Sequence, residues 1–369
     1  MALRVWLVVV RAASCDACRF MAYVGEEAVD GRAFLLESEH NLLSMATDEP
    51  LVPAAKLSPR FNATQFALRN AEKNLDGYGI SWYEADEPFP RRVRSAQPVV
   101  GHDGAADETL TSLLRGDAVP TLFRASLDSC VETPLAPPRV RLASRALFAH
   151  VRAASAVDAA PEERNSHPFA FQTLTWMHNG GIAYFDRTFR KDLEASLRPT
   201  VRSLVSGQTD SELAGAVFVD HLAGFPHRRT YDLVALRAAM LACIATIRER
   251  TRAAREKDEA TPGACASTPP SSSLNFAVTD GESLVVVRYR SHPDEDPPTL
   301  YYRDTGGGVF VSSEPDSKDP AKLKDWVLLG KNRMLSYAPG AGVHLECVDH
   351  LECDDEMPAS AALELAGEL

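Results

Sequence analysis

Hydrophobic and polar positions alternate along several short segments of the chain, which is the pattern of half-buried β-strands. Alternation combined with β-branched residues predicts strands at residues 19–24, 80–83, 284–289 and 309–312. These strands lie toward both ends of the sequence. We therefore expect sheets built from segments that are distant along the chain.

Two segments between these strands have the pattern of helices. Residues 211–222 follow Thr209-x-x-Glu212, which is a capping pattern. Residues 232–250 repeat apolar side chains every three or four positions, at Leu233, Leu236, Met240, Ile244 and Ile247. Helices clustered between outer strands indicate layered α and β structure, and not a simple βαβ alternation.

Other segments show neither the alternation of a strand nor the three-to-four-residue repeat of a helix. Residues 84–108, 134–141 and 253–273 are rich in Pro, Ser, Ala or charge and are expected to be surface insertions. An acidic tail, 346–369, has no periodicity and is expected to be mobile. Residues 1–17 are interpreted as a leader or propeptide that is removed. One domain, 18–345, is left between them.

Composition limits the classes of partner. The 369 residues are 45% hydrophobic and 24% charged, which is typical of a globular protein. A net charge of −12 argues against general affinity for nucleic acid or acidic membranes. The early apolar run, residues 5–10, is far shorter than the roughly 20 residues that span a bilayer. A small-molecule site is therefore expected.

The cysteines indicate the cellular setting. Seven are scattered along the chain, an odd number without the density of a disulfide-stapled domain, so a reducing, cytoplasmic location is predicted. Organelle targeting by residues 1–17 is the alternative. Two patterns, Cys15-x-x-Cys18 and the row His344, Cys347, His350 and Cys353, could suggest redox or zinc chemistry. Their spacing and context favour neither, so no metal and no cofactor are predicted.

Four short segments carry the candidate chemistry. They are CRFMAY at 18–23, NLDGYGISWY at 74–83, HVRAAS at 150–155 with NSHPF at 165–169 and MHNG at 177–180, and GQTDSE at 207–212. Their residues, order and rough spacing resemble the class II glutamine amidotransferases. The similarity is to the branch with the amidotransferase subunit of the fungal glutathione-degrading complex and the γ-glutamyl hydrolase of ergothioneine synthesis. Ser313-Glu-Pro315 and Trp326 extend it to about residue 337. This resemblance implies an α+β fold, the N-terminal-nucleophile (Ntn) hydrolase four-layer αββα sandwich.

Cys18 is the candidate nucleophile. A thiol is a strong nucleophile, and the free α-amine of an N-terminal cysteine can act as its own general base. The resemblance implies that Cys18 attacks the amide carbon and that water then clears the thioester. A buried strand cysteine is the alternative. Because Cys18 follows Ala17, this chemistry requires cleavage there or a later start; otherwise the protein is an inactive relative.

Asn179 and Gly180 can supply the two donors of an oxyanion hole, and the resemblance assigns them that role. The alternative is a tight Asn-Gly turn. Arg152 can hold an α-carboxylate through its planar fork, and Asp210 an α-ammonium. Their alternatives are a surface salt bridge and a helix N-terminal acid.

The resemblance adds further substrate-binding candidates: Ser155, His167, Gly77 and Tyr78. It implies hydrolysis of the γ-glutamyl amide bond of glutamine or of a compound such as glutathione. The chain has no nucleotide-binding motif of its own, which favours either a stand-alone γ-glutamyl hydrolase or a subunit that works with a separate protein. The resemblance implies that such a partner is a metallopeptidase-like or synthase subunit. The competing interpretation is an inactive scaffold or regulatory subunit that retains the fold.

Overall fold

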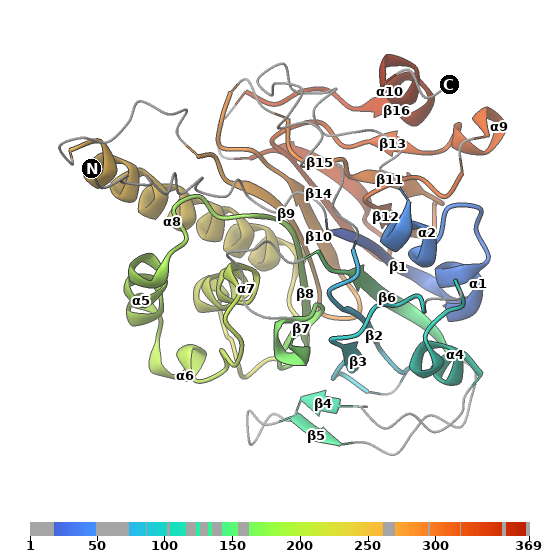
Figure 1. Cartoon of the computed structure of the whole chain (residues 1–369), viewed down its shortest axis with the longest axis horizontal. Coiled ribbons are helices and arrows are strands. Elements are labelled where there is room, and N and C mark those ends of the chain that lie inside the picture. The colour runs from blue at the N-terminus through green and yellow to red at the C-terminus, as the bar shows by residue number, and fades with distance from the viewer. Residues whose placement is uncertain are drawn as a thin grey trace, which may run out of the picture.

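The computed structural model describes residues 18–48, 74–85, 87–101, 104–115, 123–125, 132–134, 142–153, 162–260, 270–293, 296–317, 319–348 and 352–366. The predicted leader, Ser155 and most of 134–141 lie outside these ranges. Within them the chain forms two antiparallel sheets between helices (Figure 1). None of the helices in this part of the chain is long and apolar enough to cross a membrane.

The larger sheet has ten strands. Their spatial order is β16 (Met357–Pro358), β13 (Val327–Leu328), β11 (Tyr301–Asp304), β12 (Gly308–Ser312), β1 (Arg19–Asp30), β6 (Ala143–Val151), β2 (Tyr78–Trp82), β3 (Arg91–Ser95), β4 (Phe123–Ala125) and β5 (Glu132–Pro134). The first strand of the chain, β1, therefore lies in its middle, between β12 and β6.

The smaller sheet has six strands, in the order β15 (Gly342–Cys347), β14 (Arg333–Ala338), β10 (Leu284–Arg288), β9 (Ser273–Thr279), β8 (Leu174–Gly181) and β7 (Phe169–Phe171). Its outer face is covered by α5 (Arg187–Ser196), α6 (Pro199–Arg202), α7 (Asp210–His221) and α8 (Leu233–Glu259). Helices α1 (Gly31–Leu36), α2 (Leu42–Thr47) and α4 (Glu108–Arg115) cover the larger sheet. The 3₁₀ turn Glu163–Asn165 precedes β7.

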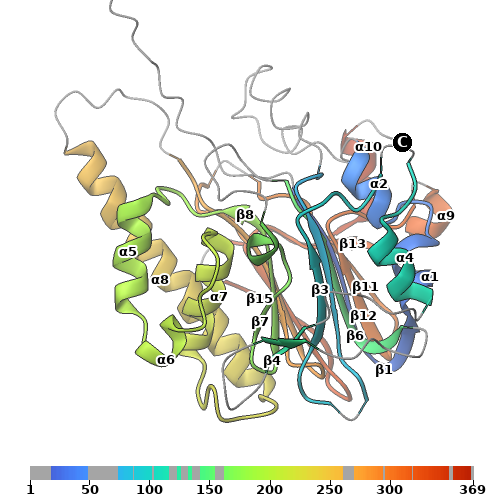
Figure 2. The same cartoon turned by 60° about the horizontal axis from the view of Figure 1, so that its bottom comes forward.

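Three apolar cores separate these layers. Alternate residues of β1 explain the arrangement, because Phe20, Ala22 and Val24 enter the core between the sheets. Met21 instead joins the core beneath α1, α2 and α4. Seen edge-on in Figure 2, the order is helix, sheet, sheet, helix. The predicted αββα sandwich is confirmed.

The predicted helices form, with instructive differences. Thr209 Oγ1 accepts from Glu212 N at 3.1 Å, but the Glu212 carboxylate accepts from the backbone nitrogens of Ser206 and Gly207, so only half of the capping box exists. Helix α8 runs to Glu259, nine residues beyond its predicted end at residue 250. Pairs four residues apart, such as Arg252 with Glu256, extend it into the expected linker 253–273.

The expectation that residues 84–108 form a surface insertion is wrong for β3. This strand pairs with β2 along its whole length, and Arg92, Val93 and Arg94 are buried. The arginines hid the strand pattern, since their burial depends on distant carbonyls such as that of Pro168, which accepts from Arg92 at 3.0 Å. Charged residues enter interiors when such partners exist.

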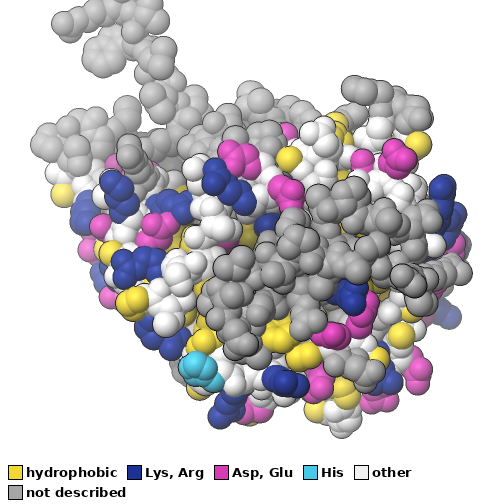
Figure 3. All heavy atoms as spheres, turned by 90° about the horizontal axis from the view of Figure 1, so that it is seen from below, with side chains coloured by type: hydrophobic (Ala, Val, Ile, Leu, Met, Phe, Trp, Pro, Cys, Tyr) yellow, Lys and Arg dark blue, Asp and Glu magenta, His cyan; other side chains and the backbone are white. Residues whose placement is uncertain are grey.

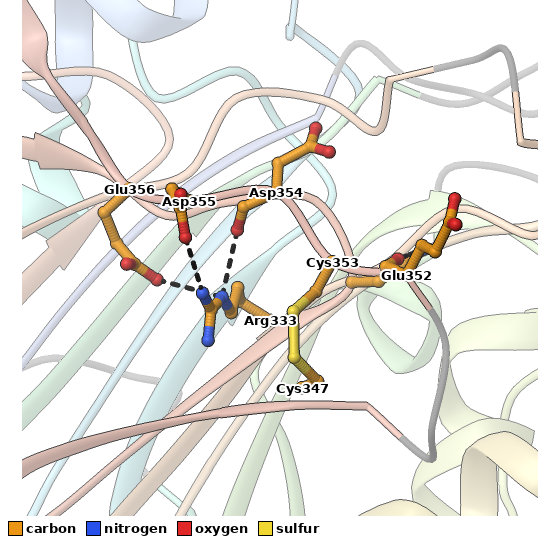
Figure 4. Close-up of a disulfide and its surroundings, with 8 residues drawn as sticks. Arg333, Cys347, Glu352, Cys353, Asp354, Asp355 and Glu356 are labelled. Carbon is orange, nitrogen blue, oxygen red and sulfur yellow. Dashed lines mark hydrogen bonds and ion pairs between the residues drawn. A yellow bond between two sulfur atoms is a disulfide. The ribbon is translucent and has the colours of Figure 1, made fainter.

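The acidic tail is also ordered in part, contrary to expectation. Strand β16 pairs with β13, and α10 (Ala359–Ala366) packs Ala362 and Leu363 against Trp326. Cys347 and Cys353 form a disulfide (Figure 4). Beside it, Arg333 holds the Asp354 carbonyl at 2.9 Å. Helix α9 (Pro320–Leu323) completes this corner.

The molecular surface mixes both signs of charge. On the face drawn in Figure 3, Lys and Arg side chains alternate with Asp and Glu among the described atoms, with hydrophobic side chains between them. Among the described atoms on this face, neither sign of charge gathers into one block.

Candidate active site

The Cys18 thiol lies at the start of β1, against the segment that leaves β6. Its sulfur is 3.4 Å from both the nitrogen and the carbonyl oxygen of Ala153. The residue is buried, with 7% of its surface exposed. Alternation puts the Cys18 side chain on the same side of the chain as Phe20, which enters the core between the sheets, and Cys18 itself packs against Ala153.

Arg152 lies beside Cys18, and Gly77 lies on the other side of Arg152, directly before the next strand, β2. Arg19 pairs with Val151 in the register of β1 and β6, so Arg152 follows directly beside Cys18. The Arg152 nitrogen donates to Gly77 O at 2.9 Å, and its carbonyl accepts from Asp76 N at 3.0 Å. The Asp76-Gly77 turn therefore borders the same end of the sheet.

Gly77 can occupy this turn because it has no side chain. Its φ is +125°, and a β-carbon would lie 2.6 Å from the carbonyl oxygen of Ser95. Tyr78, however, points away from Cys18. Its ring belongs to the outer core with Ile80, and its hydroxyl lies 2.5 Å from Asp107 Oδ1. The predicted pocket role of the Tyr78 side chain is therefore wrong, because strand alternation puts it on the opposite face.

Asn179 and Gly180 come from the end of β8 in the facing sheet. They pair with Asn275 and Leu274 of β9, so the dipeptide is strand and not a hairpin turn. Gly180 has φ +138°, and a β-carbon there would lie 2.1 Å from Ser273 O. The Asn179 side chain is 1% exposed, and neither its Nδ2 nor its Oδ1 has a hydrogen-bond partner among the described residues. Such a buried amide is unusual and available to a ligand.

Asp210 is the first residue of α7 and reaches the same region. Its carboxylate accepts from Ile182 N at 2.9 Å and from Ser211 Oγ at 3.2 Å. Burial raises the pKa of Asp210, these hydrogen bonds partly oppose the rise, and the charge of Cys18 adds to it. The interaction with Cys18 means that the acid and the thiol belong to one electrostatic site.

The three histidines have different surroundings. His167 is buried and stacked on His150 with ring centroids 4.0 Å apart, and neither of its ring nitrogens has a partner in the described part of the chain. Burial, together with the neighbouring His150, His178 and Arg152, holds the pKa of His167 well below its usual range, so the ring is neutral. His178 instead contacts Ser211 Oγ at 2.9 Å and Ser273 O at 3.0 Å.

No group of three His, Cys, Asp or Glu residues within the described ranges could hold a metal ion. Two cavities, of about 290 and 400 Å³, border His40 and Glu314 in one case and Tyr184 and Arg248 in the other. Cys18 lines neither of them.

Some neighbours of the site were not predicted. Ala153 contacts the thiol through its backbone, which leaves no signal in the residue type. Ser211 links Asp210 to His178, and a serine directly after a candidate acid was the available signal. Ser155 lies outside the described residues.

The chain resembles known amidotransferases in sequence and in fold. It is 31% identical over 303 residues, covering 81% of this chain and 70% of the relative, to the probable glutamine amidotransferase DUG3 of Saccharomyces cerevisiae. The structure of a glutamine aminotransferase class-II domain protein from Silicibacter pomeroyi matches 89% of this chain and 99% of its own, with 20% identity and a TM-score of 0.50. No family model matches the chain. From the sequence similarity, supported by the shared fold, we conclude that this protein belongs to the class II glutamine amidotransferases, enzymes that act on amide carbon–nitrogen bonds.

Proposed function

We propose that the protein hydrolyses the γ-glutamyl amide bond of glutamine or of a γ-glutamyl compound such as glutathione, through a thioester on Cys18. The observation that carries this proposal is the convergence of four elements. Around one end of the two sheets lie Cys18, directly before β1, Arg152, directly after β6, Asn179 and Gly180 of β8, and Asp210 of α7.

The reaction follows from the chemistry of these groups. The Cys18 sulfur attacks the amide carbon while its proton passes to the α-amine of the same residue. The Asn179 amide and the Gly180 N–H stabilise the oxyanion of the tetrahedral intermediate. Collapse breaks the carbon–nitrogen bond, and the α-amine returns the proton to the leaving ammonia or amine. Water then attacks the thioester, releasing the γ-carboxylate and the free thiol.

The buried and unpartnered amide of Asn179 supports the oxyanion role. Leaving a polar group buried without a hydrogen bond costs about 1 to 3 kcal/mol, and a bound substrate would recover that loss. Since the group is already desolvated and held by β8, little reorganisation is needed when charge develops.

Recognition of the glutamyl end is assigned to two opposite charges. Arg152 binds the α-carboxylate and Asp210 the α-ammonium, and an ammonium beside Asp210 would oppose the effect of burial on its pKa. The neutral His167, the Gly77 backbone and Ser155 form the remainder of the proposed pocket. By resemblance, we extend the proposal to a cytoplasmic enzyme that can work with a metallopeptidase-like or synthase subunit.

The test compares protein beginning at Cys18 with protein that retains Ala17, verified by intact mass. Release of glutamate from glutamine, glutathione and γ-glutamyl anilide is measured, and the thioester is trapped with hydroxylamine. Turnover and trapping are expected only with the free Cys18 amine. Equal activity with Ala17 attached contradicts the mechanism, and no turnover of any γ-glutamyl substrate by the Cys18 form would favour the scaffold.

A further inference from the structure

A buried cluster of charged side chains lies directly beside the main chain of Cys18. Arg19 Nε is 3.1 Å from Glu314 Oε1, and His40 Nε2 contacts Glu314 Oε2. All three side chains are buried: 9% of Arg19, 2% of Glu314 and 7% of His40 is exposed. They join residues that are up to 295 positions apart.

Arg19 uses two different nitrogens in this cluster. While Nε donates to Glu314, Nη1 donates to the carbonyl oxygen of Cys18 at 3.1 Å. A planar guanidinium can reach both acceptors together, whereas a lysine ammonium is a single point charge. Strand alternation places Arg19 on the face opposite the thiol, so its link to the nucleophile is through the main chain.

The segment that carries Glu314 grips the next residue as well. Ser313 N donates to Phe20 O at 2.9 Å, and Phe20 N donates to Ser313 Oγ at 3.0 Å. Ser313 therefore holds the main chain of Phe20, and Glu314 holds the side chain of Arg19. On the other side, His40 Nδ1 lies 3.2 Å from Ser44 Oγ, which ties the cluster to α2.

Stability alone is a poor explanation for such a cluster. Removing charges from water is costly, and well-packed apolar side chains often replace buried ion pairs without loss. Orientation is a better explanation, because an N-terminal cysteine has no preceding residue to restrain it. The fold can then restrain the main chain of such a cysteine only through its carbonyl group and through the residues that follow it.

We propose that Arg19, anchored by Glu314 and His40, is a positioning residue that fixes the main chain of Cys18 so that its thiol and α-amine face the substrate amide. This inference rests on the proposed role of Cys18 as an N-terminal nucleophile. Ser313 and Glu314 are not among the residues proposed to contact the substrate. The inference nevertheless gives them a role in turnover, because they hold Arg19 and the main chain next to Cys18.

The test is Arg19→Lys in protein that begins at Cys18. Lysine keeps the charge facing Glu314 but cannot also hold the Cys18 carbonyl. We expect kcat to fall on the order of 10- to 100-fold, the scale of a displacement of about 1 Å, with KM within about threefold. The rate of Cys18 alkylation by iodoacetamide, compared between variant and parent, should change with it.

Arg303→Lys is the matched control. Arg303 lines the cavity that borders Glu314, pairs with Asp316 at 3.0 Å, and places its guanidinium over the rings of Phe310 and Trp326. It should keep the parent kcat and alkylation rate. Parent-like values in Arg19→Lys, or a loss carried by KM alone, would overturn the proposal.

A second variant and the alkylation rate cover the cases in which Arg19→Lys does not fold or the parent protein is inactive. If Arg19→Lys does not fold, Glu314→Gln removes the anionic anchor with little change of shape and should lower kcat about 3- to 10-fold; a parent-like kcat overturns the proposal. If the parent itself has no γ-glutamyl hydrolase activity, the proposed function fails, while alkylation still reports whether Arg19 positions Cys18. An unchanged alkylation rate then overturns this inference separately.

Discussion

The sulfur of Cys18 lies 3.4 Å from both the nitrogen and the carbonyl oxygen of Ala153, which joins the first strand of the sheet to the segment after β6. Arg152 precedes that contact by one residue. The nucleophile directly precedes β1 and the binding cation directly follows β6, and the pairing of Arg19 with Val151 in these two adjacent strands brings them side by side.

The first prediction compares Cys18 with Cys243, the two described cysteines that are not in the disulfide. Cys18→Ala should lower turnover by at least about 1000-fold, since it removes the nucleophile, while the circular dichroism spectrum stays the same. Cys243→Ala should keep turnover, because Cys243 is buried in α8 and burial raises the pKa of its thiol well above its usual range. Equal loss in both variants would mean that activity follows fold integrity and not the thiol of Cys18.

A second prediction concerns Asn179. Its replacement by alanine should reduce kcat by about 100- to 1000-fold, the usual effect of deleting one oxyanion donor. Thermal unfolding should change little, because the amide makes no hydrogen bond to the described residues. Parent-like turnover would refute the oxyanion role, and a large stability loss would show that Asn179 supports the fold.

The glutamyl-binding pair makes a third prediction. Arg152→Ala or Asp210→Ala should weaken binding roughly 10- to 150-fold, as expected for about 1.5 to 3 kcal/mol of charge-assisted hydrogen bonding. Arg152→Lys should be nearly as damaging, because it lacks the planar fork. KM and inhibition constants measure the effect.

The control for that prediction is a substrate whose α-carboxylate is amidated. It should bind the parent enzyme poorly and respond much less to Arg152→Ala than the free acid does. Arg198→Lys, in a surface pair with Asp220, should affect neither substrate. An equal penalty of Arg152→Ala on blocked and free substrates would assign Arg152 to the fold.

The fourth prediction is the pH dependence of stability through Glu314. Burial would raise its pKa, but Arg19 and His40 overcome that effect and bring it to about 2. Because the folded-state pKa is below the unfolded one, this stabilisation is complete above the unfolded-state pKa of about 4.5 and is lost as the pH falls toward 2. Urea unfolding from pH 7 to 2 should show a smaller decline in Glu314→Gln than in the parent. The same slope in both proteins would contradict the assignment.

The sequence by itself determined the elements with a clear period and the residue types of the site. Residues 19–24 and 284–289 are short apolar runs, the second with three consecutive valines, which is enough to identify strands, and Thr209 marks the start of α7. The family followed from the motifs that contain Cys18, Arg152, Asn179 and Asp210. Such motifs are identified from residue types and from spacing over a few positions, and both are visible in the sequence alone.

Only the tertiary structure decided which distant groups meet. Arg92 in β3 reads as polar surface, yet carbonyls contributed from elsewhere allow it to be buried. In the same way, nothing local to Arg19 indicates Glu314, which is 295 residues away, as the carboxylate that its guanidinium binds while it also donates to the carbonyl oxygen of Cys18. These partners are chosen by sheet register and packing between layers, and a long-range pairing leaves no period in the sequence of either partner.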